Sequence, residues 1–175
     1  MWMKRKIQIS KRYSQEEREA IAFELIDKII ERTKNGIDRK GNQFPSYSDS
    51  YSGSLDFKIA GKSKNKVNLT LSGDMLADLQ LLNHDKGEIV IGFENGSDSN
   101  AKAEGNIKGT YGQKTSTGKK RDFLGVQEKE LREVLEKYPL DNFEKRQKRT
   151  QNINDLISDV DLISGRIILD ELQEE

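Results

Sequence analysis

The feature that most constrains the fold is a long, well-capped amphipathic helix near the amino terminus. Ser14-Gln15-Glu16-Glu17 has the form of a capping box, in which the Ser hydroxyl and the Glu carboxylate each bond an amide left free in the first turn. Behind it, Ile21, Leu25 and Ile29 recur every four residues and form one apolar stripe. The pattern predicts a helix over about 15–32, closed by an Asn-Gly pair. We expect the stripe to pack on a sheet.

Shorter elements are predicted along the rest of the chain. Residues 1–13 are predicted as an extended lead, residues 97–122 have no apolar period, and Asn95-Gly96 is a hairpin signal. From alternation and helical spacing we predict strands at 67–71 and 88–93, a short helix at 75–82, and a second helix at 127–138 that stops before Pro139. The apolar residues expected to meet the first helix are Leu69, Leu71, Ile89 and Ile91.

Residues 36–66, here called the arm, differ from the predicted elements. Glycines interrupt a Ser-, Tyr-, Asn- and Lys-rich stretch that carries isolated apolar residues, namely Phe44, Tyr47, Tyr51, Leu55 and Phe57. A segment this long without periodicity is usually functional or an ordered extension. We predict an extended arm or hairpin that reaches a neighbouring subunit, with Phe44, Tyr47, Tyr51 and Phe57 as its interface anchors; a Ser-rich disordered loop is the alternative.

These elements predict an α+β fold. A small antiparallel sheet would pack with the N-terminal amphipathic helix and a second helix, with long arms or loops added. We expect one α+β domain over 1–138 and a helical C-terminal extension over 139–175. The extension carries an apolar stripe that includes the predicted interface residues Leu156, Ile157 and Val160.

Composition narrows the chemistry. The 175 residues include no Cys and one His, which excludes disulfides, thiolate metal sites and a cysteine nucleophile. A Ser-His hydrolase would have to use His84, which follows a predicted helix end and is expected to be a surface residue there. We expect no enzymatic activity. No stretch is long and apolar enough to span a membrane, no signal-peptide pattern is found, and a cytosolic setting is expected.

Ligand motifs also fail on spacing. A phosphate-binding loop needs G-x4-G-K-[ST], whereas five residues separate Gly112 from Gly118, and Gly118-Lys119 is followed by Lys120. Two acidic loops, at 38–41 and 95–100, lack the closing bidentate carboxylate of a calcium site and are expected to be turns. We expect no cofactor and no metal.

Two basic clusters leave a nucleic-acid interpretation open. Lys114, Lys119, Lys120 and Arg121 form the first cluster, and the second lies at 145–149. Lys and Arg that neutralise phosphates give sequence-independent affinity, so the first cluster is a possible DNA-facing set. A formal net charge of zero and the lack of a repeated aromatic pattern argue against a dedicated nucleic-acid binder.

Charge is distributed unevenly between the two ends. Residues 1–40 carry eleven Lys and Arg against seven Asp and Glu, a net charge of +4. Residues 150–175 carry one Arg against seven Asp and Glu, a net charge of −6. Opposite signs suit a head-to-tail contact between copies, because complementary potentials steer and register an interface. The alternative is that both ends are solvated termini.

The order of the segments resembles a known family. The capped helix is followed by Gly36-Ile37-Asp38, then by Leu69-Thr70-Leu71-Ser72-Gly73-Asp74-Met75, and later by Arg121-Asp122-Phe123-Leu124-Gly125 ahead of a helix. Over about 14–137 the chain is similar to the phage virion morphogenesis (tail completion) family of tailed bacteriophages. It departs from that family at two places. Asp122 stands where the family often has a Pro, and Glu104 and Gly105 follow Ala103 where the family often has a His near this stretch and a Gly after it.

The resemblance implies a structural protein of the virion. It implies a homo-oligomeric ring, six- or twelve-fold, at the neck or tail end, assembled in the host cytoplasm, that completes the tail and joins it to the head. Its partners would be itself and other phage neck, connector or tail proteins, with non-specific contact to DNA in the channel and no membrane. The rival hypothesis is a small phage DNA-binding or regulatory protein that uses the basic clusters.

Overall fold

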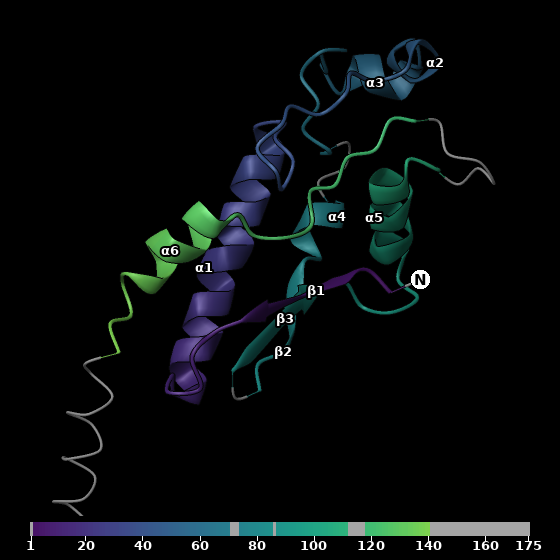
Figure 1. Cartoon of the computed structure of the whole chain (residues 1–175). Coiled ribbons are helices and arrows are strands. Elements are labelled where there is room, and N and C mark those ends of the chain that lie inside the picture. Colours follow the sequence, from purple (N-terminus) through teal and green to yellow (C-terminus); the bar gives the residue numbers. More distant parts are fainter. Residues whose placement is uncertain (1, 71–73, 86, 112–117, 141–175) are drawn as a thin grey trace, which may run out of the picture. The chain divides into compact units, whose positions relative to one another are not determined.

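The computed structural model describes residues 2–70, 74–85, 87–111 and 118–140. The chain divides after Tyr138, and every element described below belongs to the unit Met1–Tyr138. The described residues of this unit form a three-stranded antiparallel sheet and six helices, an α+β arrangement as predicted (Figure 1). The predicted extension over 139–175 lies almost wholly outside the described residues.

The sheet has the strand order β1-β3-β2, with β1 at Lys4–Gln8, β2 at Gln80–Asn83 and β3 at Glu88–Gly92. The central strand β3 is buried on both of its faces, since Ile89 and Ile91 are inaccessible on one face and Val90 is 5% exposed on the other. This explains its near-continuous apolar run. The predicted strand over 88–93 is therefore confirmed, and the predicted extended lead contributes an edge strand.

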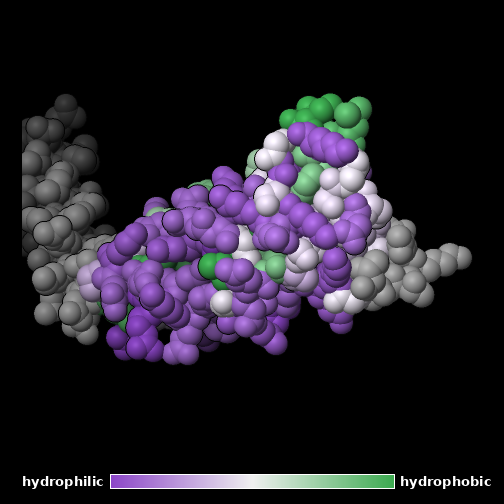
Figure 2. Space-filling model, turned by 90° about the horizontal axis from the view of Figure 1, so that it is seen from above, coloured by the Kyte–Doolittle hydropathy of each residue, from purple (hydrophilic) through white to green (hydrophobic). Residues whose placement is uncertain are grey.

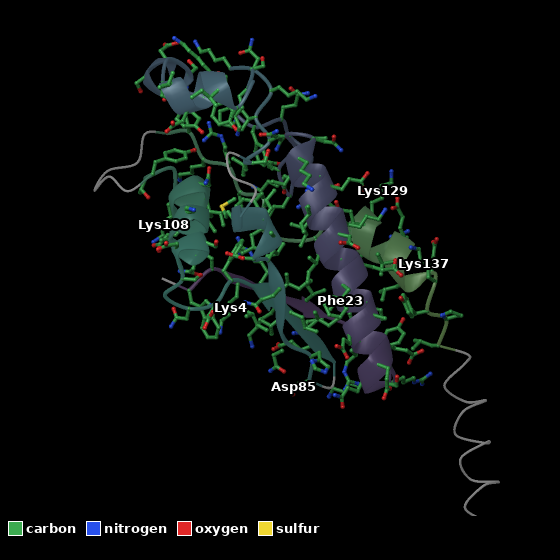
Figure 3. All side chains as sticks on the ribbon, turned by 180° about the vertical axis from the view of Figure 1, so that it is seen from behind. Lys4, Phe23, Asp85, Lys108, Lys129 and Lys137 are labelled. Carbon is green, nitrogen blue, oxygen red and sulfur yellow. The ribbon has the colours of Figure 1, made fainter. Side chains whose placement is uncertain are left out.

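Helix α1 (Gln15–Lys34) packs across β2 and β3 and is the longest element described. Its capping box is present as predicted: the Glu17 amide donates to Ser14 Oγ, and the Ser14 amide donates to Glu17. Ile21, Leu25 and Ile29 are completely buried, which confirms the predicted stripe. Helix α6 (Glu128–Leu135) lies beside α1, and Lys137 just beyond it bonds Glu24 of α1 at 2.5 Å (Figure 3).

Two predicted elements are wrong. The strand expected at 67–71 is irregular backbone, because Leu69 has a φ of +53° and the Thr70 amide turns back to the Asn68 side chain at 3.3 Å. Leu71 lies outside the described residues. The helix expected at 75–82 is split into α4 (Asp74–Ala77) and β2, because pairing with β3 outweighs the helical spacing of the leucines.

The sequence patterns did not predict the 11-residue helix that follows β3. Asn95-Gly96 forms a turn that leads into α5 (Asp98–Lys108) instead of a hairpin. The buried face of α5 is made of small or polar residues, so it gives no large apolar period; these are Ser99, Asn100, Ala103 and Gly105. The readable signals were at its ends, where Ser97 accepts from the Asn100 amide and Gly109 closes the helix with a φ of +72°.

Leu25→Ala is expected to lower the free energy of unfolding by about 2–5 kcal/mol, because the truncated side chain leaves a cavity in the α1–sheet core. Urea or thermal unfolding measures the loss. Phe23→Ala is the matched control on the same helix, since Phe23 is 52% exposed, and a change within about 0.5 kcal/mol is expected there. A Leu25→Asp protein that is soluble and melts normally would contradict the burial of this face.

Candidate functional site

The arm leaves the C-terminal end of α1 and contains two short helices, α2 (Asp49–Ser52) and α3 (Leu55–Ile59). Its base is a small hairpin in which Ile37 pairs with Gln43 and the Phe44 amide donates to the Gly36 carbonyl at 2.7 Å. Asp38 closes the turn by accepting from the amides of Lys40 and Asn42, both at 2.8 Å. Burial disfavours the Asp38 carboxylate, but these amides outweigh it and lower the pKa of Asp38.

The aromatic residues of the arm pack on one another. The ring centroids of Tyr47, Tyr51 and Phe57 lie 5.1–5.4 Å apart, with Phe57 edge-on to both tyrosines. Tyr47 and Phe57 are 5% and 4% exposed, and Phe44 at the base is also buried. This corrects the predicted interface role of Phe44, Tyr47 and Phe57, because rings enclosed within one chain do not form its contact surface. Tyr51 is partly exposed.

Arg121 fastens the arm to the body. Its guanidinium donates to the carbonyls of Pro45, at 3.1 Å and 3.3 Å, and Ser46, at 3.3 Å, and to the Tyr111 hydroxyl. It also lies over the Tyr47 and Tyr111 rings, 5.1 Å and 5.2 Å from their centroids. Burial raises the pKa of Tyr111, so its phenol stays protonated near neutrality and acts as a hydrogen-bonding group.

The first basic cluster is therefore divided by the structure. Arg121 is 4% exposed and its donors are used inside the chain, which corrects its assignment as a DNA-facing residue. Lys119 also bonds the arm, since its Nζ donates to the Ser46 carbonyl at 3.1 Å. Lys120 is exposed, and Lys114 lies outside the described residues. Within the described chain, Lys119 and Arg121 therefore bond the arm, and Lys120 is the member of this cluster that is exposed to solvent.

Residues 121–125, here called the hub segment, bond the arm, strand β1 and helix α1. Asp122 accepts from Arg39 Nε at 2.5 Å and from Arg5 at 3.4 Å, and Arg5 also donates to the Leu124 carbonyl at 3.1 Å. Phe123 is fully buried and packs edge-on against Phe93. The segment singled out by the resemblance thus has a structural role in this chain.

A buried ion pair fixes the hub segment to α1. Arg32 pairs with Glu130 of α6, and its Nη2 donates to the carbonyls of Phe123 at 2.8 Å and Gly125 at 2.7 Å. Glu130 also accepts from the Gln127 amide at 2.8 Å, which caps α6. The Arg32 Nε is buried without a partner in the described structure. Since the Glu130 carboxylate and the two carbonyls engage both Nη atoms, this buried arginine connects parts of the same chain.

The exposed feature of the arm is an apolar pair on α3. Leu55 and Ile59, four residues apart on one helical face, are 70% and 75% exposed. Figure 2, seen from the α2–α3 side of Figure 1, shows a hydrophobic cap projecting from a largely hydrophilic surface. Residues 54–66 around the pair carry four Lys and one Asp, a net charge of +3.

Sequence reasoning missed this pair as a unit. Leu55 was noted as an isolated apolar residue and Ile59 was not noted. The available signal was Ser54, which caps α3 by accepting from the Phe57 amide at 3.3 Å, followed by apolar residues at helical spacing. A one-turn helix is too short for a periodicity test, so only burial distinguishes the inward Phe57 from its outward neighbours.

The remaining predicted residues carry no further site. Leu156, Ile157, Val160 and the cluster at 145–149 lie outside the described residues. Among the residues that the structure does describe, no group of three His, Asp or Glu side chains is placed to hold a metal ion. No helix in the described ranges is both long and apolar enough to cross a membrane.

Comparison with protein-family models, with curated proteins and with solved structures finds no match for this chain.

Arg121→Ala is expected to loosen the arm without unfolding the body. The variant removes the donors to Pro45 and Ser46 and the cation above Tyr47, so residues 48–66 should be cut faster in limited proteolysis, by about tenfold if roughly 1.4 kcal/mol of local stability is lost. Lys120→Ala is the control, because Lys120 is exposed. Equal cleavage of the two variants would contradict the fastening role of Arg121.

Proposed function

We propose that this chain is a structural virion protein of a tailed phage, which forms a ring at the neck or tail end, completes the tail and joins it to the head. Two independent arguments support the proposal. The order of its segments resembles the tail-completion family, and its fold presents an apolar contact surface on a fastened arm.

The observation that carries the assembly part of the proposal is the apolar pair, Leu55 and Ile59. Exposed apolar patches within a polar surface mark protein contact sites, and this pair lies in a Lys-rich segment of the chain. The arm beneath it is built for a fixed position, since Arg121 and Lys119 tie its backbone to the body. A contact surface on a fixed arm suits a subunit whose one heterologous contact is repeated around a ring.

The DNA-binding hypothesis has less support. It relied on the first basic cluster, and within that cluster Arg121 and Lys119 bond the arm. A formal net charge of zero gives no general attraction to phosphate. We therefore propose that contact with DNA is secondary and follows from assembly of the ring around a channel.

The test is the assembly state of the purified full-length protein. Light scattering after gel filtration, followed by electron microscopy, should give closed rings with six- or twelve-fold symmetry at high protein concentration. A monomer at every concentration would overturn the ring. A salt-dependent affinity of that monomer for duplex DNA would support the DNA-binding hypothesis instead.

A further inference from the structure

We propose that the apolar pair on α3 is the docking site for the acidic C-terminal segment, residues 153–172, of a second copy of this chain. The inference rests on the assembly part of the proposed function and names the two surfaces that meet. It begins from the exposure of Leu55 and Ile59, whose side chains are left largely in water.

The receptor surface has a defined chemistry. Two aliphatic side chains stand on one face of α3. Lys58 of the same helix and Lys66 further along the arm are exposed, whereas Lys64 is paired with Asp49 of α2. Phe57 on the opposite face anchors the helix in the aromatic cluster with Tyr47 and Tyr51. The surface is therefore apolar, it lies in a segment of positive net charge, and the aromatic cluster supports it from the opposite face of α3.

The C-terminal segment has the complementary chemistry. Its sequence pattern places Ile153, Leu156, Ile157 and Val160 at the spacing of one helical stripe. The surrounding residues 150–175 have a net charge of −6. An amphipathic helix that docks in this way would set its apolar stripe on Leu55 and Ile59 and its carboxylates among the lysines. A second α3 is a poor occupant, because two segments of positive net charge repel each other.

The length of the connection decides whether a second copy is within reach. Lys137 and Tyr138 both bond Glu24 in the middle of α1, at 2.5 Å and 2.8 Å, which fixes the point where the connection begins. The twelve residues between Leu140 and Ile153 span at most about 45 Å when extended. A domain of this size is about 35–40 Å across. The connection is long enough to reach a neighbouring subunit.

The experiment uses full-length protein and two variants that each lose one surface. The receptor variant is Leu55→Asp with Ile59→Asp, and the donor variant is Leu156→Asp with Val160→Asp. Phe23→Asp is the control, because Phe23 is also exposed but lies on α1. Circular dichroism and thermal melting check that each variant folds, and sedimentation velocity measures its assembly.

The expected result is specific to a contact between copies. Each variant alone should be monomeric at concentrations where the unaltered protein and the Phe23→Asp control assemble. An equimolar mixture of the two variants should form dimers and nothing larger, because the intact C-terminal segment of one variant can dock on the intact α3 of the other and no second contact remains.

Other outcomes overturn the inference in distinguishable ways. A mixture that stays monomeric while the unaltered protein assembles would mean docking within one chain or α3-to-α3 contact. Variants that assemble normally would remove this interface and leave the proposed ring intact. If the mixture of variants forms dimers but the unaltered protein forms open linear assemblies, the inference is supported and the ring is contradicted. An unaltered protein that is always monomeric would overturn both.

Discussion

Arg32→Met is expected to lower the free energy of unfolding by about 3–5 kcal/mol, the range for removing one partner of a buried ion pair. The Arg32 and Glu130 side chains are 6% and 12% exposed, so the variant leaves a carboxylate with little access to water. It also removes the donor that reaches the Phe123 and Gly125 carbonyls. The loss should be largest for the hub segment and for the packing of α6 on α1.

Chemical denaturation of Arg32→Met and of a matched control variant distinguishes the loss of the buried ion pair from the loss of an arginine in general. Arg132→Met is the matched control, because Arg132 bonds Glu128 on the exposed face of α6, where both side chains are more than two-thirds exposed. That change should cost less than about 0.5 kcal/mol. Adding Glu130→Gln to Arg32→Met should recover part of the loss, since the buried charge is then gone. Equal costs for Arg32→Met and Arg132→Met would contradict the role of the buried pair.

The sequence predicted well those elements whose signals are local and redundant. In α1 the capping box, the apolar stripe and the closing Asn-Gly pair all agree, so its start at Gln15 and the burial of Leu25 could be predicted. The central strand β3 could be predicted for a related reason. Three consecutive buried aliphatic residues in a short run leave a strand buried on both faces as the simplest solution.

Elements whose structure depends on contacts with distant parts of the chain could not be predicted from local patterns. Met75, Leu76, Leu79 and Leu82 have helical spacing, but hydrogen bonding to β3 makes residues 80–83 a strand. Helix α5 buries small and polar side chains, including Asn100, whose Oδ1 accepts from the Met3 amide at 2.7 Å. That contact joins residues 97 positions apart, and no local pattern reports it.

The candidate site was predictable in location and not in detail. A long aperiodic arm indicated a functional extension, and the aromatic residues in it were recognised. Which of these rings point inward could not be predicted, because isolated aromatic residues in a Ser-rich stretch show no periodicity that would define a buried face. The structure turns Tyr47 inward against Arg121 and Phe57 inward against Tyr47, and it leaves Leu55 and Ile59 outward. Arg121 was assigned to a charged surface because a buried arginine and a solvated one look alike in sequence.

Gly92→Ala is expected to displace the edge strand β1, at a cost of about 3 kcal/mol or more. Gly92 pairs with Lys4, and an added Cβ would lie 2.5 Å from the Met3 carbonyl oxygen and 2.8 Å from the Lys4 Cα. Backbone atoms cannot rotate away as side-chain ends do, so the two strands must separate. The neighbouring bond from the Phe93 amide to the Met3 carbonyl, 3.1 Å, should break with them.

Trp2 reports this displacement directly, because it is the single tryptophan of the chain and its Nε1 donates to the Phe93 carbonyl at 2.6 Å. Gly92→Ala should shift its fluorescence emission to longer wavelength, because the indole, which is already 40% exposed, loses this bond and its remaining cover when β1 lifts. Gly96→Ala is the matched control: Gly96 has a φ of +83° and nothing within 4 Å of an added Cβ, so it carries conformational strain of roughly 1–2 kcal/mol without a clash. That control should melt earlier with its emission unchanged. An unshifted Trp2 emission in Gly92→Ala would mean that β1 and β3 tolerate the extra methyl group, and that the close approach of these strands does not determine glycine at this position.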